Sequence, residues 1–190
     1  MGTYLFISYS NLTPIAAIKL IADAAGGFIY SESNSNTLTI KPRYKKTWWD
    51  SIAIDDYDRI IPESVVTDIS TDYIMYPDYN GVFLTNDRNG NTGQVKRVGT
   101  AGDVKLEPIN DPLFTSVSAM YEKGREVLAK AGMVQTHSLL MPITQEIGQC
   151  LPGELTVFNG DWWGITDGVS GSFSYEKVTQ TTSIERVNCE

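Results

Sequence analysis

The chain has 190 residues, of which 42% are hydrophobic and 20% are charged, and this composition is typical of a globular protein. Its 15 Lys and Arg against 23 Asp and Glu give a formal net charge of −8. Duplex nucleic acid and anionic membranes both attract basic proteins, so we expect neither as a partner, and no apolar run is long enough for a transmembrane helix.

Histidine and cysteine are too scarce for most metal sites. His137 is the single histidine, which excludes sites built on two, and no Cys-x-x-Cys pair occurs. We therefore expect no metal and no cofactor. Cys150 and Cys189 are expected to stay reduced and unpaired, because Cys189 lies next to the chain end.

The N-terminal part predicts a strand, a helix and a hairpin. Residues 4–9 alternate like a short strand, and residues 1–10 lack the basic start of a secretory signal, which favours synthesis in the cytoplasm. Thr13 as N-cap, Pro14 and the terminating Gly26 predict a helix over 14–25. Its apolar face is expected to contain Ile15, Ile18, Ala22 and Ala25, with Ile21 beside them. Strands 28–30 and 37–42 then form the hairpin.

Residues 43–50 are aromatic and basic inside an acidic protein, and a connector over 51–63 follows. A second hairpin is expected from strands 81–85 and 94–98 around a polar loop. Asp111 as N-cap and Pro112 predict a helix over 112–131. Gly124 lies on the apolar face of this helix, and a close approach by a neighbouring element would explain it.

The remaining C-terminal sequence reads as β-structure. Five short strand candidates within residues 133–187, separated by turn signals, favour a barrel or a small sandwich. The sequence therefore predicts an α+β fold that is mostly β. We divide it into a strand-helix-hairpin unit (1–50), a connector (51–63) and a barrel-like β-domain with the packed helix 112–131 (64–190).

Catalytic and metal-binding templates were tested against simpler interpretations. Residues Asp87, Asn89 and Asn91 imitate a calcium loop, but the loop lacks the required Gly and the bidentate Glu, so a hairpin tip is favoured. The acids of the connector, Asp55, Asp56 and Asp58, fit a solvated surface better than a catalytic pair. His137 has no nucleophile elbow near it in sequence, which favours a position inside a strand. We expect no catalytic residues.

Aromatic residues next to charge predict an interface. The candidates are Arg43, Tyr44, Trp48, Trp49, Trp162 and Trp163. Trp and Arg are enriched where domains or subunits meet, and adjacent Trp residues on an extended chain point to opposite sides. Stacking of single-stranded bases on Trp48 and Trp49 is the alternative, although the other strands offer no matching basic surface.

Several segments, in order, resemble the tail proteins of tailed bacteriophages and prophages, of the baseplate-hub type. These are Leu20-Ile-Ala-Asp-Ala-Ala-Gly-Gly, Asn36-Thr-Leu-Thr-Ile-Lys-Pro-Arg-Tyr, Trp48-Trp49, Ile61-Pro62, Tyr79-Asn80-Gly-Val, Gly124-Arg125, Leu151-Pro-Gly, Trp163-Gly and Gln180-Thr-Thr-Ser-Ile-Glu-Arg. Members of the family are longer, so the chain resembles a C-terminal portion. The motif Lys123-Gly-Arg125 departs from the family's Arg-Gly.

The resemblance implies a structural component of a tail or baseplate hub, which self-associates as a trimer and docks on tube, hub or spike proteins. It implies a place in the virion after assembly in the host bacterial cytoplasm. The acidic charge would suit a lumen through which DNA slides. Two rivals stay open. One is an enzyme degrading cell wall or polysaccharide, with acids drawn from Asp55, Asp56, Asp161 and Asp167, and the other is a carbohydrate-binding module using the four Trp residues. A cleft joining two carboxylates to an aromatic platform would favour these rivals, and a flat apolar patch would favour assembly.

Overall fold

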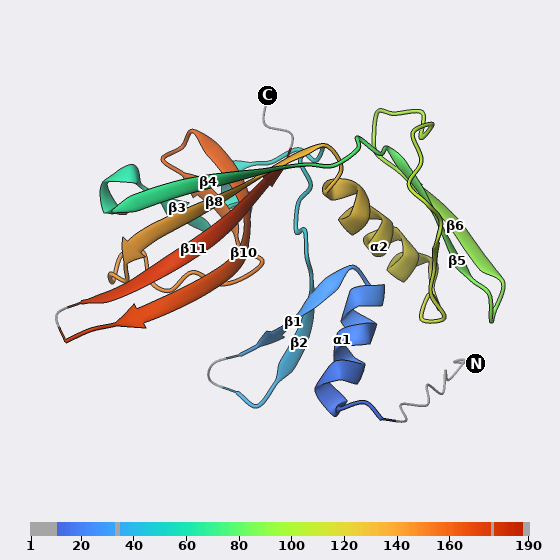
Figure 1. Cartoon of the computed structure of the whole chain (residues 1–190), viewed down its shortest axis with the longest axis horizontal. Coiled ribbons are helices and arrows are strands. Elements are labelled where there is room, and N and C mark those ends of the chain that lie inside the picture. Colours follow the sequence, from blue (N-terminus) through green and yellow to red (C-terminus); the bar gives the residue numbers. More distant parts are fainter. Residues whose placement is uncertain (1–10, 33–34, 176, 188–190) are drawn as a thin grey trace.

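The computed structural model describes residues 11–32, 35–175 and 177–187. The described chain is α+β and mostly β, as predicted, with two α-helices and three β-sheets. Figure 1 shows a large sheet on one side, a small sheet with helix α2 on the other, and helix α1 with a hairpin below them. The expected strand over residues 4–9 lies outside the described residues.

The large sheet has six strands in the order β3-β9-β10-β11-β8-β4. Its strands are β3 (Arg59–Ile61), β4 (Asp68–Met75), β8 (Met133–Pro142), β9 (Leu155–Phe158), β10 (Trp162–Phe173) and β11 (Val178–Val187). All neighbours pair antiparallel except β3, which runs parallel to β9. The predicted connector over 51–63 thus supplies one edge strand of this sheet.

The large sheet is open, and the prediction of a barrel is wrong for the described residues. Strands β3 and β4 form its two edges and do not pair with each other. The glycines at 168 and 171 are among the turn signals that separated the five strand candidates, yet β10 continues through both of them. Its pairing with β11 is irregular only between Thr166 and Gly168. One long hairpin of β10 and β11 therefore takes the place of three of the five short strand candidates, and the sheet ends at the unpaired edges of β3 and β4.

The small sheet has the order β6-β5-β7, with β5 at Gly81–Asn86, β6 at Asn91–Lys96 and β7 at Ile109–Asn110. Helix α2 (Val117–Ala129) packs on this sheet and not across the large one. The prediction of a close approach at Gly124 is confirmed, because a Cβ there would lie 2.5 Å from the Cβ of Val95 on β6. Gly124 lets the helix approach the strand closely enough to bury Val95.

Helix α2 begins five residues later than predicted. Ser116 is its N-cap, and its hydroxyl accepts a hydrogen bond from the backbone N–H of Ala119 at 3.2 Å. The carboxylate of Asp111 accepts from the N–H of Leu113 at 2.8 Å and so closes a local turn. Both residues have capping chemistry, and the sequence alone does not show which of them starts the helix.

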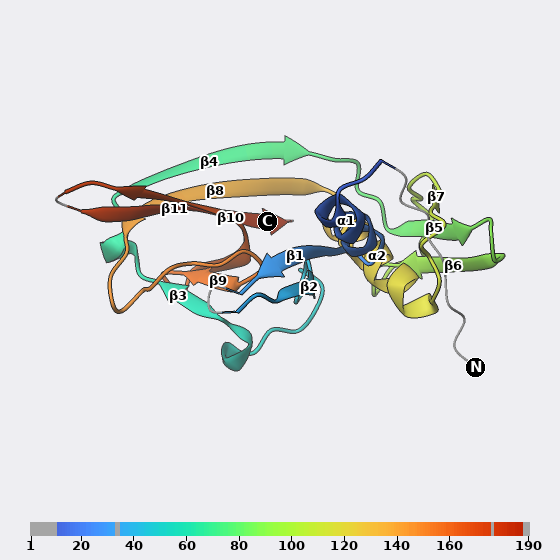
Figure 2. The same cartoon turned by 90° about the horizontal axis from the view of Figure 1, so that it is seen from below.

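Helix α1 (Pro14–Ala24) packs on the hairpin of β1 (Gly27–Ser31) and β2 (Leu38–Pro42). Thr13 caps α1 as predicted, and Gly26 adopts a positive φ of 64° after its end. The predicted apolar face is only partly buried: Ala22 is buried, whereas Ile15 and Ile21 are 52% and 42% exposed. Ala24, which was not predicted on that face, is buried as well. Figure 2 shows this unit beside α2 and the large sheet.

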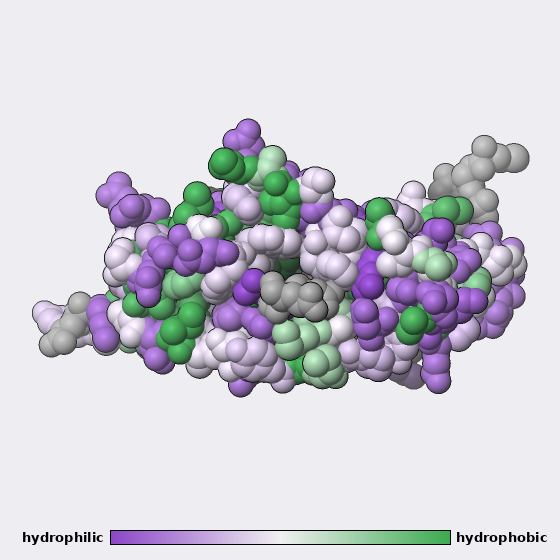
Figure 3. All heavy atoms as spheres, turned by 90° about the horizontal axis from the view of Figure 1, so that it is seen from above, coloured by the Kyte–Doolittle hydropathy of each residue, from purple (hydrophilic) through white to green (hydrophobic). Residues whose placement is uncertain are grey.

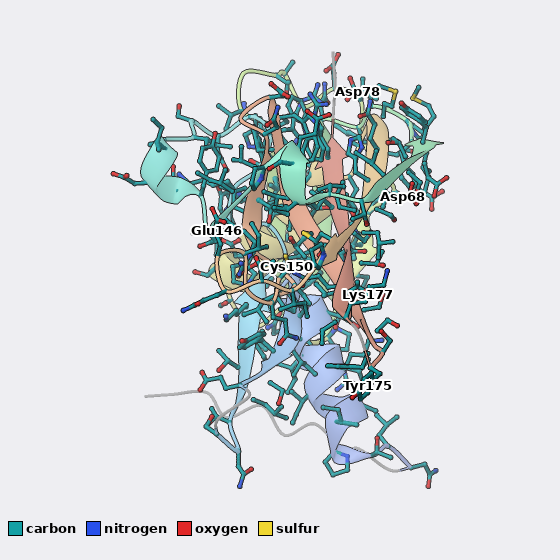
Figure 4. All side chains as sticks on the ribbon, turned by 90° about the vertical axis from the view of Figure 1, so that its left-hand side faces the viewer. Asp68, Asp78, Glu146, Cys150, Tyr175 and Lys177 are labelled. Atoms are coloured by element: carbon teal, nitrogen blue, oxygen red, sulfur yellow. The ribbon has the colours of Figure 1, made fainter. Side chains whose placement is uncertain are left out.

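The buried side chains form three clusters. One lies between α2 and the small sheet, and two lie on the large sheet, around Leu139 and around Tyr44. Cys150 is a buried free thiol in the second cluster, while the Tyr175 end of the β10–β11 hairpin is exposed (Figure 4). Cys189 lies outside the described residues. Among the described helices, none has the length and apolarity needed to cross a membrane.

Candidate functional site at the junction of the two sheets

Residues 43–50, here called the junction segment, connect the hairpin to the rest of the chain. Its first two side chains contact the large sheet. The guanidinium of Arg43 lies 2.5 Å from the carboxylate of Asp167 and 3.5 Å from that of Glu185. The hydroxyl of Tyr44 donates to Glu185, and Tyr44 is buried. These contacts fix the start of the segment against β10 and β11.

The local charges shift the pKa values of these groups in consistent directions. Burial raises the pKa of the Tyr44 phenol, and the adjacent Glu185 carboxylate raises it further. Burial alone would lower the pKa of Arg43, but Asp167 and Glu185 outweigh it and raise that pKa. Tyr44 therefore stays a neutral hydrogen-bond donor, and Arg43 stays a cation.

The other basic residues of the junction segment are also paired. The ammonium of Lys45 lies 2.8 Å from Asp58, and that of Lys46 lies 3.1 Å from Asp56. Asp58 additionally accepts from the backbone N–H of Leu155 at 2.9 Å. A surface that binds nucleic-acid phosphates needs free cations, and these cations already have carboxylate partners. The arrangement gives no support to base stacking at this segment.

Asp50 connects the end of the junction segment to helix α2. Its carboxylate accepts from the backbone N–H of Thr47 at 2.8 Å and from the Thr47 hydroxyl at 2.7 Å. Arg125 on α2 lies 2.6 Å from the same oxygen. Burial would raise the pKa of Asp50, but the Thr47 and Arg125 contacts lower it. The ionised carboxylate thus ties the segment to the helix.

The two adjacent tryptophans have different neighbours. Their rings meet edge to face with centroids 5.1 Å apart. Trp49 packs against both the α2 cluster and the Tyr44 cluster, so it lies between the two sheets. The guanidinium of Arg97 lies 4.7 Å from the ring centroid of Trp48. The buried indole N–H of Trp48 has no hydrogen-bond partner among the residues that the structure describes.

A pocket of about 260 Å³ opens beside the junction segment, and we call it the junction pocket. It is lined by Tyr44, Lys46, Trp48, Ala129, Asp161, Trp162, Trp163, Ile165, Glu185 and Arg186. The pocket therefore brings together four of the six predicted interface residues. Tyr44 and Trp48 lie more than 110 positions before Trp162 and Trp163 in the chain. Arg43 and Trp49 lie next to the pocket through their contacts with Glu185 and Trp48 and do not line it.

Trp162 and Trp163 pack on different clusters, as alternation along β10 requires. Trp162 stacks on His137 with centroids 4.2 Å apart and on Phe158 at 5.1 Å. Trp163 packs against the Tyr44 cluster. His137 is buried in β8, and its Nδ1 lies 2.9 Å from the Thr71 hydroxyl. Burial, reinforced by the Arg186 charge, lowers the pKa of His137, so the ring is neutral at pH 7.

Two carboxylates line the pocket, and the sequence singled out only one of them. Asp161 was a candidate acid and is exposed at the pocket wall. Glu185 was missed, because nothing local in β11 distinguishes it from other strand residues. It already accepts from Tyr44 and faces Arg43, which makes it a structural partner. Asp167 is paired with Arg43, and Asp55 lies away from the pocket on the short 3₁₀ turn η1 (Ile54–Asp56).

The loop that imitates a calcium site is a hairpin tip. The side-chain oxygen of Asn86 accepts from the backbone N–H groups of Arg88 and Asn89, and that of Asn89 accepts from Asn91. These oxygens stabilise the turn between β5 and β6. Within the part of the chain that the structure describes, no three His, Cys, Asp or Glu side chains are grouped so that they could hold a metal ion.

Comparison with known proteins places this fold among tail proteins. No family model matches the sequence, and no curated protein matches it. A tail protein from Neisseria meningitidis MC58 matches 90% of this chain at 11% identity and a TM-score of 0.53. The 43 kDa tail protein of prophage MuSo2 from Shewanella oneidensis matches 94% at 15% identity and a TM-score of 0.52. A chain in the virion of a native gene transfer agent matches 92% at 12% identity and a TM-score of 0.51.

The chain has the fold of part of a phage tail protein. It spans 54% of the length of each of the two tail proteins and 39% of the gene transfer agent chain. The family that the sequence resembles and the fold of the structural neighbours therefore agree. At these identities the likeness concerns the arrangement of the chain alone.

Proposed function

We propose that the chain is a structural component of a phage or prophage tail, at the tail tip or baseplate hub. The observation that supports this most strongly is the fold match, which extends over 90–94% of the chain in three tail or virion proteins. At 11–15% identity this match concerns the fold, and a shared fold alone does not establish a shared function.

In this proposal the chain acts by association with copies of itself, as a trimer, and with tube, hub or spike proteins. The face shown in Figure 3 carries several small patches of apolar side chains among polar residues. Exposed apolar patches are typical of surfaces that contact other proteins, and this supports the proposed contacts. The net charge of −8 suits a channel that must let DNA pass without binding it. Assembly in the bacterial cytoplasm and a final place in the virion follow from this role.

We also propose that the chain is not an enzyme. Of the four acids considered for hydrolysis, Asp56 is paired with Lys46 and Asp167 with Arg43. Asp55 and Asp161 have no ion pair among the described residues, but only Asp161 lines the junction pocket. A glycosidase needs one carboxyl group kept protonated and one ionised, facing each other across the substrate. Turnover of peptidoglycan or of a glycan panel that is lost in Asp161→Asn would contradict this proposal.

Incorporation into tails tests the structural role. An epitope tag on the protein in its bacterial host is expected to co-purify with tail particles through a density gradient and to resist high-salt washing. The tag on an unrelated cytoplasmic protein is the control. If the tagged protein remains entirely in the particle-free fraction, the structural role is wrong. Light scattering after size exclusion measures self-association and is expected to give an oligomer.

A further inference from the structure

The junction pocket has features that holding the chain together does not require. The surrounding charges of residues 43–50 are paired, yet a hollow of about 260 Å³ stays open between the segment, β10 and β11. This pocket is close to the smaller end of the range in which proteins hold small molecules.

One ring in the aromatic wall of the pocket, that of Trp163, packs against the Tyr44 cluster and is still partly exposed. The ring of Trp48 contacts Trp49 and Arg97. The ring of Trp162 contacts His137, Phe158 and the guanidinium of Arg186, which lies 5.7 Å from its centroid. Trp163 is partly exposed, and no aromatic or cationic side chain in the described part of the chain stacks on it. Its packing against the Tyr44 cluster restricts the side chain of Trp163 before a ligand binds, and this lowers the entropic cost of binding.

The polar groups of the pocket favour a neutral ligand with both donors and acceptors. Asp161 and Glu185 are balanced by Lys46 and Arg186, so the four charges sum to zero. Arg186 makes no ion pair among the described residues and can donate. The exposed Asp161 carboxylate can accept. An ion would gain little binding energy from a pocket of zero net charge. A sugar ring has apolar C–H faces that can stack on Trp163, and its hydroxyls can accept from Arg186 and donate to Asp161.

We infer that the junction pocket binds one ring of a neutral oligosaccharide, with Trp163 as the stacking surface and Asp161 and Arg186 as hydrogen-bonding partners. The inference does not depend on the structural role proposed above. It assigns recognition only, because no bond is broken and Glu185 is held by Tyr44 and Arg43. Amino sugars and plain hexoses share the required chemistry.

Indole NMR distinguishes this site from the rest of the chain. The protein has four tryptophans, of which Trp48, Trp162 and Trp163 line the pocket and Trp49 does not. With ¹⁵N-labelled tryptophan, each indole signal is assigned by one Trp→Phe variant. Titration with N-acetylchitotriose or with maltotriose is expected to move the Trp163 signal most and to leave the Trp49 signal in place. Binding of the first probe alone indicates amino sugars, and binding of the second indicates hexoses.

Two carboxylate variants complete the test. Asp161→Asn removes a charged hydrogen-bond acceptor from the pocket and is expected to weaken binding about tenfold. Asp72→Asn is the matched control, because Asp72 is exposed on β4 and does not line the pocket, and it is expected to bind like the unchanged protein. The inference is overturned if neither probe moves the Trp163 signal, if Trp49 moves equally, or if both variants bind alike.

Discussion

The junction segment and the outer surface of the α1–hairpin unit differ in a way that the sequence does not suggest. The junction segment looks like a partner surface, with its basic and aromatic residues, yet Arg43, Lys45, Lys46 and Asp50 all have partners within the chain. The α1–hairpin unit looks like a core, with an apolar periodic helix, yet Leu20, Ile40 and other apolar residues of this unit are largely exposed.

The difference indicates which surface is left for other proteins. A charged side chain that already has an oppositely charged partner inside its own chain has little binding energy left for a subunit. Exposed isoleucine and leucine still have their apolar area to bury, at about 25 cal/mol per Å². The interface residues predicted at the tryptophans stay a prediction, and the α1–hairpin surface is a second candidate that the structure adds.

The largest effect is expected for Trp49, because it packs against two clusters at once. Trp49 is partly buried, and replacing it by Ala removes its packing against both clusters. Trp49→Ala is therefore expected to lower the free energy of unfolding by about 3 kcal/mol, the low end for large-to-small changes of Trp. Chemical denaturation of the isolated chain measures the change. Equal stability of Trp49→Ala and the unchanged protein would contradict its place between the two sheets.

Trp48→Phe is the matched control for that change. It keeps an aromatic ring against Arg97 and removes the buried indole N–H that has no partner. Deleting an unsatisfied donor removes a desolvation penalty, so the loss of stability is expected to be clearly smaller than for Trp49→Ala.

The local elements were predictable from the sequence, because their signals are local. Thr13 and Gly26 delimit α1 closely, and Gly124 correctly indicated tight packing of α2. The polar loop after residue 85 correctly indicated a hairpin. Capping chemistry was ambiguous only where two candidates, Asp111 and Ser116, compete within five residues.

The long-range arrangement was not predictable in the same way. β3 pairs with β9 nearly one hundred residues later, and Arg43 finds Asp167 at a separation of 124 residues. Neither contact leaves a mark in the local order of apolar and polar residues, so the sequence of each segment does not reveal its distant partner. The aromatic residues of the pocket were predicted, because Trp and Tyr next to charged residues are visible in the sequence. Glu185 and Arg186 were not predicted, because they reach the pocket only through the pairing of β11 with β10.

The next effect concerns Asp50, which joins the junction segment to α2. Asp50→Ala removes acceptors for the Thr47 backbone N–H, the Thr47 hydroxyl and Arg125. The pair is partly exposed, so we expect a loss of about 2 kcal/mol, below that for a fully buried pair. Thermal unfolding measures it, with Asp72→Ala on the exposed β4 as the control. A loss no larger than that of the control would show that the tie to α2 is dispensable.

A smaller effect is expected from the titration of His137. Its pKa is lower in the folded chain than in the unfolded one, chiefly because of burial, so the unfolded state binds more protons below about pH 6.5. Stability is therefore fully present above that pH and falls as the pH is lowered through this region towards the folded pKa. Melting temperatures between pH 7 and 5 check the slope, which should flatten in His137→Gln. An unchanged slope in that variant would assign it to carboxylates.

The smallest effect on stability, and the one that tests the comparison most directly, concerns the outer face of α1. Ile15→Ser and Ile21→Ser exchange exposed apolar side chains for small polar ones, and exposed substitutions usually change stability by less than about 0.5 kcal/mol. If this face contacts another copy or another tail protein, the same changes remove buried apolar area from that contact and weaken association. Ala22→Ser, at a buried position of the same helix, should destabilise the chain itself. Light scattering and thermal unfolding on the three variants separate the two effects.

Loss of self-association in the isoleucine variants at unchanged melting temperature would identify this face as the subunit contact. Intact association would contradict that, and the tryptophans of the junction segment would then be the remaining candidates for the subunit contact.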